Sequence, residues 1–160
     1  DPGSARIRRN VTDALRLVRK APSLRASVEN NASYVGQTLA TRLVDARRFS
    51  ATTALCREFS AMGSRIVARN VCEKAHMTVG ITWFKEHQWE KAIAALSSCV
   101  EADGRSADEC RSNLVSAYWN LANDEAKRHG GAGERAVLKR CLEALPTATR
   151  CRERARTIAR

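Results

Sequence analysis

Hydrophobic residues recur at spacings of three and four along almost the whole chain, which is the period of an α-helix and not the alternation of a β-strand. Residues that end or begin helices interrupt this pattern at Pro22, Gly63-Ser64, Asp103 to Ser106, Gly130 to Gly133 and Pro146-Thr147. The pattern predicts an all-α fold of eight helices, approximately at 5–20, 23–46, 49–62, 64–86, 88–102, 106–129, 133–145 and 147–159. Because the connections are short, consecutive helices should pack antiparallel.

The length of 160 residues suits one domain with a hydrophobic core of its own. No apolar stretch approaches the roughly 18 residues that a membrane-spanning helix needs, and the first residues lack the pattern of a signal peptide. We therefore expect no membrane span within this sequence, and anchoring by a further segment stays open.

Internal similarity centres on residues 79 to 96. A large and a small residue stand together there, followed by an aromatic one turn later, an aromatic opening the next helix and an alanine in its first turn: Val79-Gly80, Trp83, Trp89, Ala92 and Leu96. This arrangement resembles the tetratricopeptide repeat, in which small residues let two helices pack closely. Residues 113–122 resemble the first helix of another copy, and Leu39-Ala40, Leu43 and Phe49 resemble a third.

The spacing departs from that of the family, whose repeat is about 34 residues long. The small-residue position recurs at Ala40, Gly80 and Val115, so both intervals are longer than the family repeat, and a larger residue stands at the last position. The resemblance implies an α-solenoid of antiparallel helix pairs in one domain, 1–160, with a flanking helix at 1–22, repeats at 33–62, 73–104 and 108–145, and a capping helix at 147–160. The alternative is a generic helical bundle.

In that family the first helices line a concave groove, so the resemblance also implies a partner-binding face. Its candidate residues are Tyr34, Gln37, Thr41, Lys74, Met77, Ile81, Phe84, Lys85, Ser112, Ser116, Trp119 and Asn120. Exposed Phe, Met and Trp side chains beside lysines and amides would suit a protein or peptide with an apolar anchor and some acidic character. The alternative is that Phe84 and Trp119 only pack between repeats.

The six cysteines form three consecutive pairs, each centred on a predicted helix break. Their midpoints fall at residue 64, between 104 and 105, and at residue 146. Residues equally distant from a tight turn lie opposite each other in an antiparallel helix pair, within reach of a disulfide. We predict the bonds Cys56–Cys72, Cys99–Cys110 and Cys141–Cys151, and with them an oxidising, extracytoplasmic compartment. The alternative is six free, buried thiols.

The formal net charge of +11 favours an anionic partner without choosing among nucleic acid, lipid and protein. Arg outnumbers Lys 22 to 6, which a GC-rich bacterial genome also produces, and apart from residues 6–9 and 150–160 the basic residues are scattered. A nucleic-acid-binding protein is therefore only an alternative, to be tested by a steep salt dependence of affinity.

Patterns for catalysis are missing from the sequence. The three histidines show no metal-ligand spacing, no Cys-x-x-Cys pair occurs, and the glycines at 130–133 lack the lysine of a phosphate-binding loop. We expect no enzyme activity, metal or cofactor. The sequence favours a non-catalytic protein–protein interaction scaffold of the bacterial cell envelope, or as an alternative the sensory ectodomain of a membrane-anchored kinase or receptor.

Overall fold

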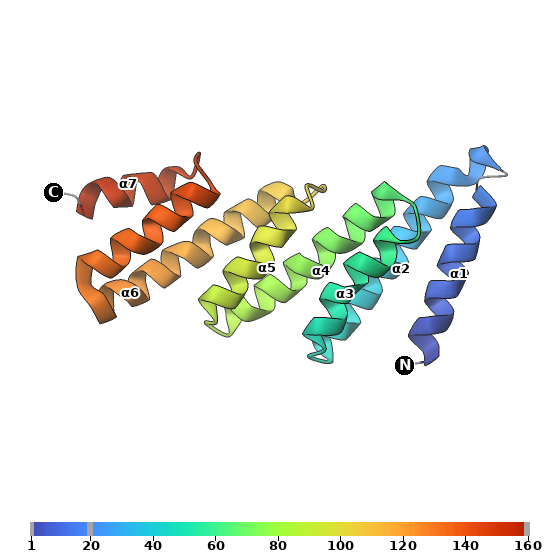
Figure 1. Ribbon diagram of the computed structural model, residues 1–160, viewed down its shortest axis with the longest axis horizontal. Coiled ribbons are helices and arrows are strands. Elements are labelled where there is room, and N and C mark those ends of the chain that lie inside the picture. Colours follow the sequence, from blue (N-terminus) through green and yellow to red (C-terminus); the bar gives the residue numbers. More distant parts are fainter. Residues whose placement is uncertain (1, 19–20, 159–160) are drawn as a thin grey trace.

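The computed structural model describes residues 2–18 and 21–158, and these form helices and turns without a β-strand. The all-α prediction is confirmed. The elements are α1 (Pro2–Val18), the 3-10 helix η1 (Pro22–Leu24), α2 (Arg25–Asp45), α3 (Phe49–Ser60), α4 (Arg65–Lys85), α5 (Trp89–Glu101), α6 (Ala107–Ala144) and α7 (Thr149–Ile158). Figure 1 shows the helices arranged in an elongated row, with the two ends of the chain at opposite ends of the row.

The described chain has seven α-helices where the sequence predicted eight. The two helices expected at 106–129 and 133–145 are joined as α6, which has non-helical backbone angles at Gly130 (φ 64°, ψ −159°). Glycine adopts this positive φ without the steric cost that a Cβ would bring. A single residue therefore reverses the chain, and Figure 1 shows the two limbs of α6 folded back on each other.

The pair α2–α3 is repeated by the pair α4–α5, and the two first helices are offset along the chain by the same interval as the two second helices. The first helix of each pair has 21 residues, and the second has 12 or 13. Both hairpins turn through a residue with positive φ, Arg47 at 55° and His87 at 57°. The next amide then bonds back to the carbonyl of Leu43 in one pair and of Trp83 in the other. The same local hydrogen bonds thus close both hairpins.

Two helical glycines allow close packing in this row. A Cβ on Gly36 of α2 would stand 2.3 Å from Cγ2 of Val71 on α4, and a Cβ on Gly80 of α4 would stand 2.7 Å from Cγ of Leu96 on α5. Val71 and Leu96 are both fully buried. The absence of a side chain at the two glycines therefore lets neighbouring helices approach within ordinary contact distance.

Buried carboxylates connect successive helix pairs. Glu29 of α2 is 7% exposed and accepts a hydrogen bond from Oγ of Ser64 at 2.9 Å, while Ser64 itself caps the first turn of α4. Glu73 of α4 is 5% exposed and accepts from the backbone amide of Ser106 at 2.7 Å, just before α6. Each carboxylate thus holds the start of the next long helix in place. The same hydrogen bonds compensate the buried carboxylate, whose burial without a partner would cost free energy.

Two of the three predicted disulfides are present: Cys99–Cys110 joins α5 to α6, and Cys141–Cys151 joins α6 to α7. The third predicted bond is absent from this structure, in which Cys56 and Cys72 are free thiols. Turn symmetry does bring these two side chains into contact. Proximity follows from the helix hairpin, whereas bond formation also depends on an oxidant.

Candidate functional site

A polar recess of about 250 Å³ lies between α2, α4 and the connection from α5 to α6. We call it the α2–α4 recess. Its residues are Asn30, Ser33, Tyr34, Gln37, Asn70, Glu73, Arg105 and Ser106. Each of the four residues from α2 has another of them three or four positions away, so they share one face of that helix. Tyr34 and Gln37, two of the residues predicted to bind a partner, lie here together.

Part of the α2–α4 recess is held in place by hydrogen bonds between α2 and α4. Nε2 of Gln37 donates to the backbone carbonyl of Asn70 at 3.3 Å, and Nδ2 of Asn70 donates to Oγ of Ser33 at 3.2 Å. These contacts orient both amide side chains and leave the carbonyl oxygens of the two side chains without a described donor. Oriented amides of this kind bind a polar ligand with little further loss of conformational entropy.

Three further side chains of the recess have no partner among the described residues, whereas Glu73 accepts a hydrogen bond from the backbone amide of Ser106. Asn30, Tyr34 and Arg105 form no side-chain hydrogen bond or ion pair within the described residues. Tyr34 is 70% exposed, although a tyrosine usually buries much of its ring. Arg105 adds an exposed guanidinium, which binds carboxylates in a two-point fork. The recess therefore offers an aromatic surface, amide groups, the positive charge of Arg105 and the carboxylate of Glu73.

A second recess of about 420 Å³ brings together three more of the predicted residues, Phe84, Lys85 and Asn120. We call it the α4–α6 recess. The ring of Phe84 meets Trp89 edge to face at 5.2 Å, and Nε1 of Trp89 donates to Asp124 at 2.7 Å. This hydrogen bond, with help from a lysine nearby, lowers the pKa of Asp124. Phe84 is half-buried by this contact and is only partly available to a partner.

Trp119 lies apart from both recesses, beneath α7. The guanidinium carbons of Arg150 and Arg154 stand 4.8 and 4.3 Å from the centre of its ring. Arg154 also forms an ion pair with Glu134. Trp119 is therefore occupied in cation–π contacts that attach α7 to α6.

Met77 and Ile81 were expected to be exposed in the groove, and this expectation is wrong for Met77. It is 9% exposed and packs against the disulfide between Cys99 and Cys110, with Ile81 at the edge of the same cluster. The helical period placed these residues on a candidate groove face, but α5 and α6 cover that part of α4. Only the tertiary contacts decide which neighbour a helix face meets.

The four remaining predicted residues do not line either recess. Thr41 and Ser116 use their hydroxyls within their own helices, donating to the carbonyls of residues 37 and 112. Lys74 is half-buried, whereas Ser112 is exposed. The twelve predicted residues are thus distributed over separate surfaces and do not form one continuous described pocket.

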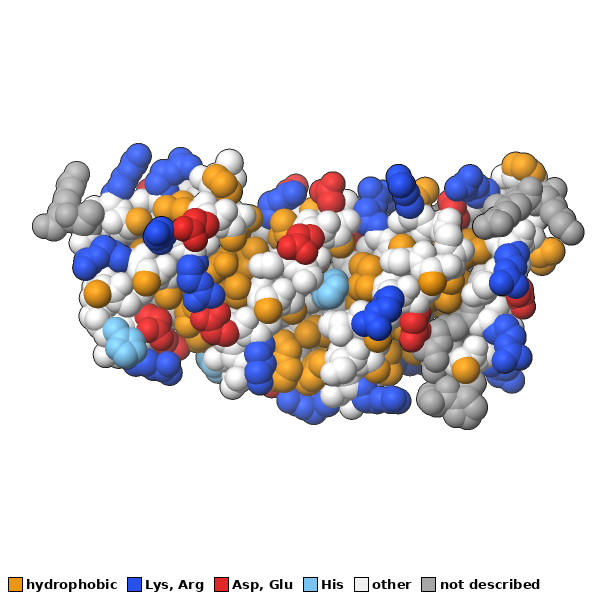
Figure 2. Space-filling view, viewed as in Figure 1, with side chains coloured by type: hydrophobic (Ala, Val, Ile, Leu, Met, Phe, Trp, Pro, Cys, Tyr) orange, Lys and Arg blue, Asp and Glu red, His pale blue; other side chains and the backbone are white. Residues whose placement is uncertain are grey.

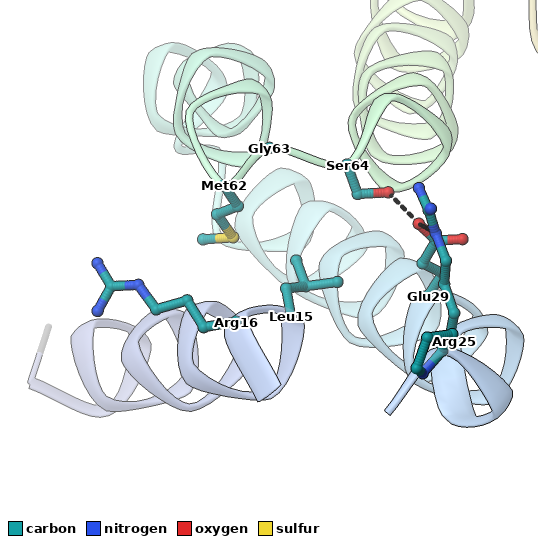
Figure 3. A pocket seen from close by; sticks show the side chains of 8 residues that line it. Leu15, Arg16, Arg25, Glu29, Met62, Gly63 and Ser64 are labelled. Atoms are coloured by element: carbon teal, nitrogen blue, oxygen red, sulfur yellow. Dashed lines mark hydrogen bonds and ion pairs between the residues drawn. The ribbon is translucent and has the colours of Figure 1, made fainter. Parts of the chain in front are cut away.

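A further recess near the N-terminal end was not predicted from the sequence. It has about 260 Å³ and lies among α1, α2 and the turn from α3 to α4. Figure 3 shows Glu29 and Ser64 meeting at one side, with Leu15 and Met62 at the other. Because Glu29 is already paired with Ser64 and Arg25, we assign the polar side of this recess to the joint between helix pairs. The serine directly after Gly63 was the signal for a helix cap in the sequence.

Figure 2 shows lysine and arginine side chains distributed along the whole face, with acidic and hydrophobic groups between them. No group of three or more His, Cys, Asp or Glu side chains suitable for a metal ion occurs in the ranges 2–18 and 21–158. None of the helices within those ranges has the length and hydropathy of a membrane span.

No protein-family model, curated protein or solved structure matches the chain.

Proposed function

We propose that this protein is a non-catalytic interaction module, a tetratricopeptide-like α-solenoid that binds an extended peptide segment of a partner protein. The peptide occupies the α2–α4 recess. One observation carries the proposal: two neighbouring first helices present oriented amides beside an exposed tyrosine and an unpaired arginine. An extended peptide has backbone donors and acceptors for the amides, an apolar side chain for Tyr34 and, in an acidic segment, a carboxylate for Arg105.

The repeated geometry of the helix pairs supports the solenoid. The pairs α2–α3 and α4–α5 have matching lengths, matching turns and a constant offset along the chain, and each pair is attached to the next long helix through a buried glutamate. Stacked units of this kind present equivalent faces of successive helices side by side. A recess between α2 and α4 is the place where two such faces meet.

We place the protein outside the cytoplasm, in a bacterial cell envelope. The two disulfides support this location, since cytosolic thiols are held reduced. The alternatives are the sensory ectodomain of a membrane-anchored kinase or receptor and a basic nucleic-acid-binding protein.

The experiment is a selection from a displayed library of random peptides, followed by titration of the enriched peptides against purified variants. Tyr34→Ala and Asn30→Ala are informative because neither side chain has a partner within the described fold, so both variants should stay folded. Lys139→Ala on α6, at an exposed position outside the recess, is the matched control.

We expect acidic peptides with an apolar residue to be enriched, and each recess variant to weaken them about tenfold or more, as for a central interface residue. The control should bind as the native protein does. A selection without enrichment, or peptides that bind Tyr34→Ala unchanged, would reject the α2–α4 recess as the site.

A further inference from the structure

The joint between α3 and α4 differs from the two joints that follow it, because its two cysteines are not bonded. Cys56 and Cys72 are half-buried, and their thiols are hydrogen-bonded to each other. The cysteine pairs at the α5–α6 and α6–α7 joints are both oxidised. Along the row of helices, the cysteine pair between α3 and α4 is therefore in the thiol form, and the two pairs that follow are disulfides.

A histidine completes the open joint. Nε2 of His76 lies 3.3 Å from Sγ of Cys56. Cys72 and His76 are separated by one helical turn on α4, so both side chains face α3. Burial lowers the pKa of His76, and the negative charge of Glu101 opposes this effect only in part. The imidazole is therefore neutral at neutral pH and can accept a proton.

The environment makes the two thiols unequal. The hydrogen bond from Cys56 lowers the pKa of Cys72 against the effect of burial. The pKa of Cys56 is raised by the same hydrogen bond, with burial and the charge on Cys72 acting in the same direction. A thiolate is the form that attacks a disulfide, and the lowered pKa of Cys72 is the reason to assign the attack to this residue.

We propose that Cys56, Cys72 and His76 form a thiol–disulfide exchange site that accepts a low-molecular-weight disulfide. The thiolate of Cys72 attacks one sulfur of the disulfide RSSR, its S–S bond breaks, and one RS⁻ leaves. Cys56 then gives its proton to Nε2 of His76 and attacks the sulfur of Cys72 in the mixed disulfide, releasing the second RS⁻.

The exchange balances without another reactant. Two protein thiols and one RSSR become the Cys56–Cys72 disulfide and two RSH, and the protons of the two cysteines end on the released thiols. The RSSR is reduced by two electrons and the protein pair is oxidised by two. The result is a third covalent joint, formed across the same kind of helix hairpin as the other two.

The experiment incubates the 160-residue chain in glutathione buffers with an increasing share of the oxidised form. Free thiols are blocked by rapid alkylation, and mass spectrometry of the digested protein reads every cysteine separately. We expect a Cys56–Cys72 linked peptide at the oxidised end of the series. Two alkylated thiols throughout the series, or a link to any other cysteine, would refute the site.

Single variants test the separate roles. Cys56→Ser should accumulate a glutathione adduct on Cys72, because the resolving thiol is missing. Cys72→Ser should form its adduct on Cys56 about tenfold more slowly, since that thiol ionises less readily. Equal rates in the two variants would refute the assignment of Cys72 as the attacking residue.

His76→Gln separates proton acceptance from packing. Glutamine fills a similar volume and makes hydrogen bonds but does not take the proton. We expect the mixed disulfide to persist longer in this variant while the same linked peptide forms in the end. Resolution as fast as in the native protein would refute the role of His76. Circular dichroism of each variant confirms folding, and the time course of the native chain tests the site even if a variant fails to fold.

Discussion

Gly36 tests whether α2, α3 and α4 pack as closely as the structure requires. A Cβ at this position would lie 2.3 Å from Cγ2 of Val71 and 2.9 Å from Cζ of Phe59. Both neighbours are fully buried, so neither side chain can turn into solvent. We therefore expect Gly36→Ala to destabilise the fold, although alanine favours helices.

The magnitude follows from two opposing effects. Replacing glycine by alanine inside a helix stabilises it by about 1 kcal/mol. Overpacking a buried site costs about 1–3 kcal/mol, and the contact of 2.3 Å at Gly36 argues for the upper end of this range. The net loss should be about 2 kcal/mol, which for a chain of this length lowers Tm by about 4–8 °C.

The assay is thermal and urea unfolding followed by circular dichroism. Ser112→Ala, at an exposed position of α6, is the control for helix propensity and should be neutral or slightly stabilising. The decisive measurement is a double-mutant cycle with Val71→Ala, which removes the methyl groups that the new Cβ would meet. Since the added methyl fills the space vacated by Val71, the double variant should lose about 1–2 kcal/mol less than the sum of the single variants. Additive losses, or a Gly36→Ala protein as stable as the native one, would contradict the close approach of α2 and α4.

Three further measurements address the joints between the helices. Replacing both Cys99 and Cys110 by Ala should cost about 3 kcal/mol, from the entropy of a short closed loop, measured by urea unfolding under non-reducing conditions. The ion pair with Arg140 lowers the pKa of Glu90. The stabilisation by this pair is therefore fully present above the unfolded-state pKa of Glu90 and is lost as pH falls through the folded-state pKa. The difference in unfolding free energy between the native protein and Glu90→Gln should be under about 1 kcal/mol at pH 7 and should vanish at strongly acidic pH. Trp89→Phe removes the hydrogen bond to Asp124, so the pKa of Asp124 should rise toward its ordinary value in an NMR titration, and an unchanged pKa would exclude that contact.

Local sequence signals predicted the helices and most of their ends. The break predicted at Gly63-Ser64 is the turn between α3 and α4, where Ser64 caps the first turn of α4. Pro146 lies shortly after the end of α6. These signals act through backbone angles and hydrogen bonds within a few residues, so a sequence contains them directly. The glycines at 130–133 were correctly taken as a break, because the backbone leaves helical geometry at Gly130 and the two limbs of α6 on either side correspond to the two helices expected there.

The candidate groove was harder to predict, because it depends on which helix covers which face. Tyr34 and Gln37 lie together as the helical period implied, but Met77 is covered by the disulfide cluster of α5 and α6. Asn70 and Arg105 were missed in the sequence, since one lies on α4 and the other in the loop before α6. Only the packing of α2, α4 and this loop brings Asn70 and Arg105 to the same recess.

The sequence by itself determined the helical class, the positions of the turns and the pairs of cysteines that face one another, because each of these depends on periodicity and on local backbone preference. The tertiary structure decided which helix faces are buried and where polar groups from α2 and α4 meet. It also decided that Cys56 contacts His76 and forms no disulfide with Cys72. Such outcomes depend on distances of a few ångströms between segments far apart in the chain, and those distances are set by packing of the whole row of helices.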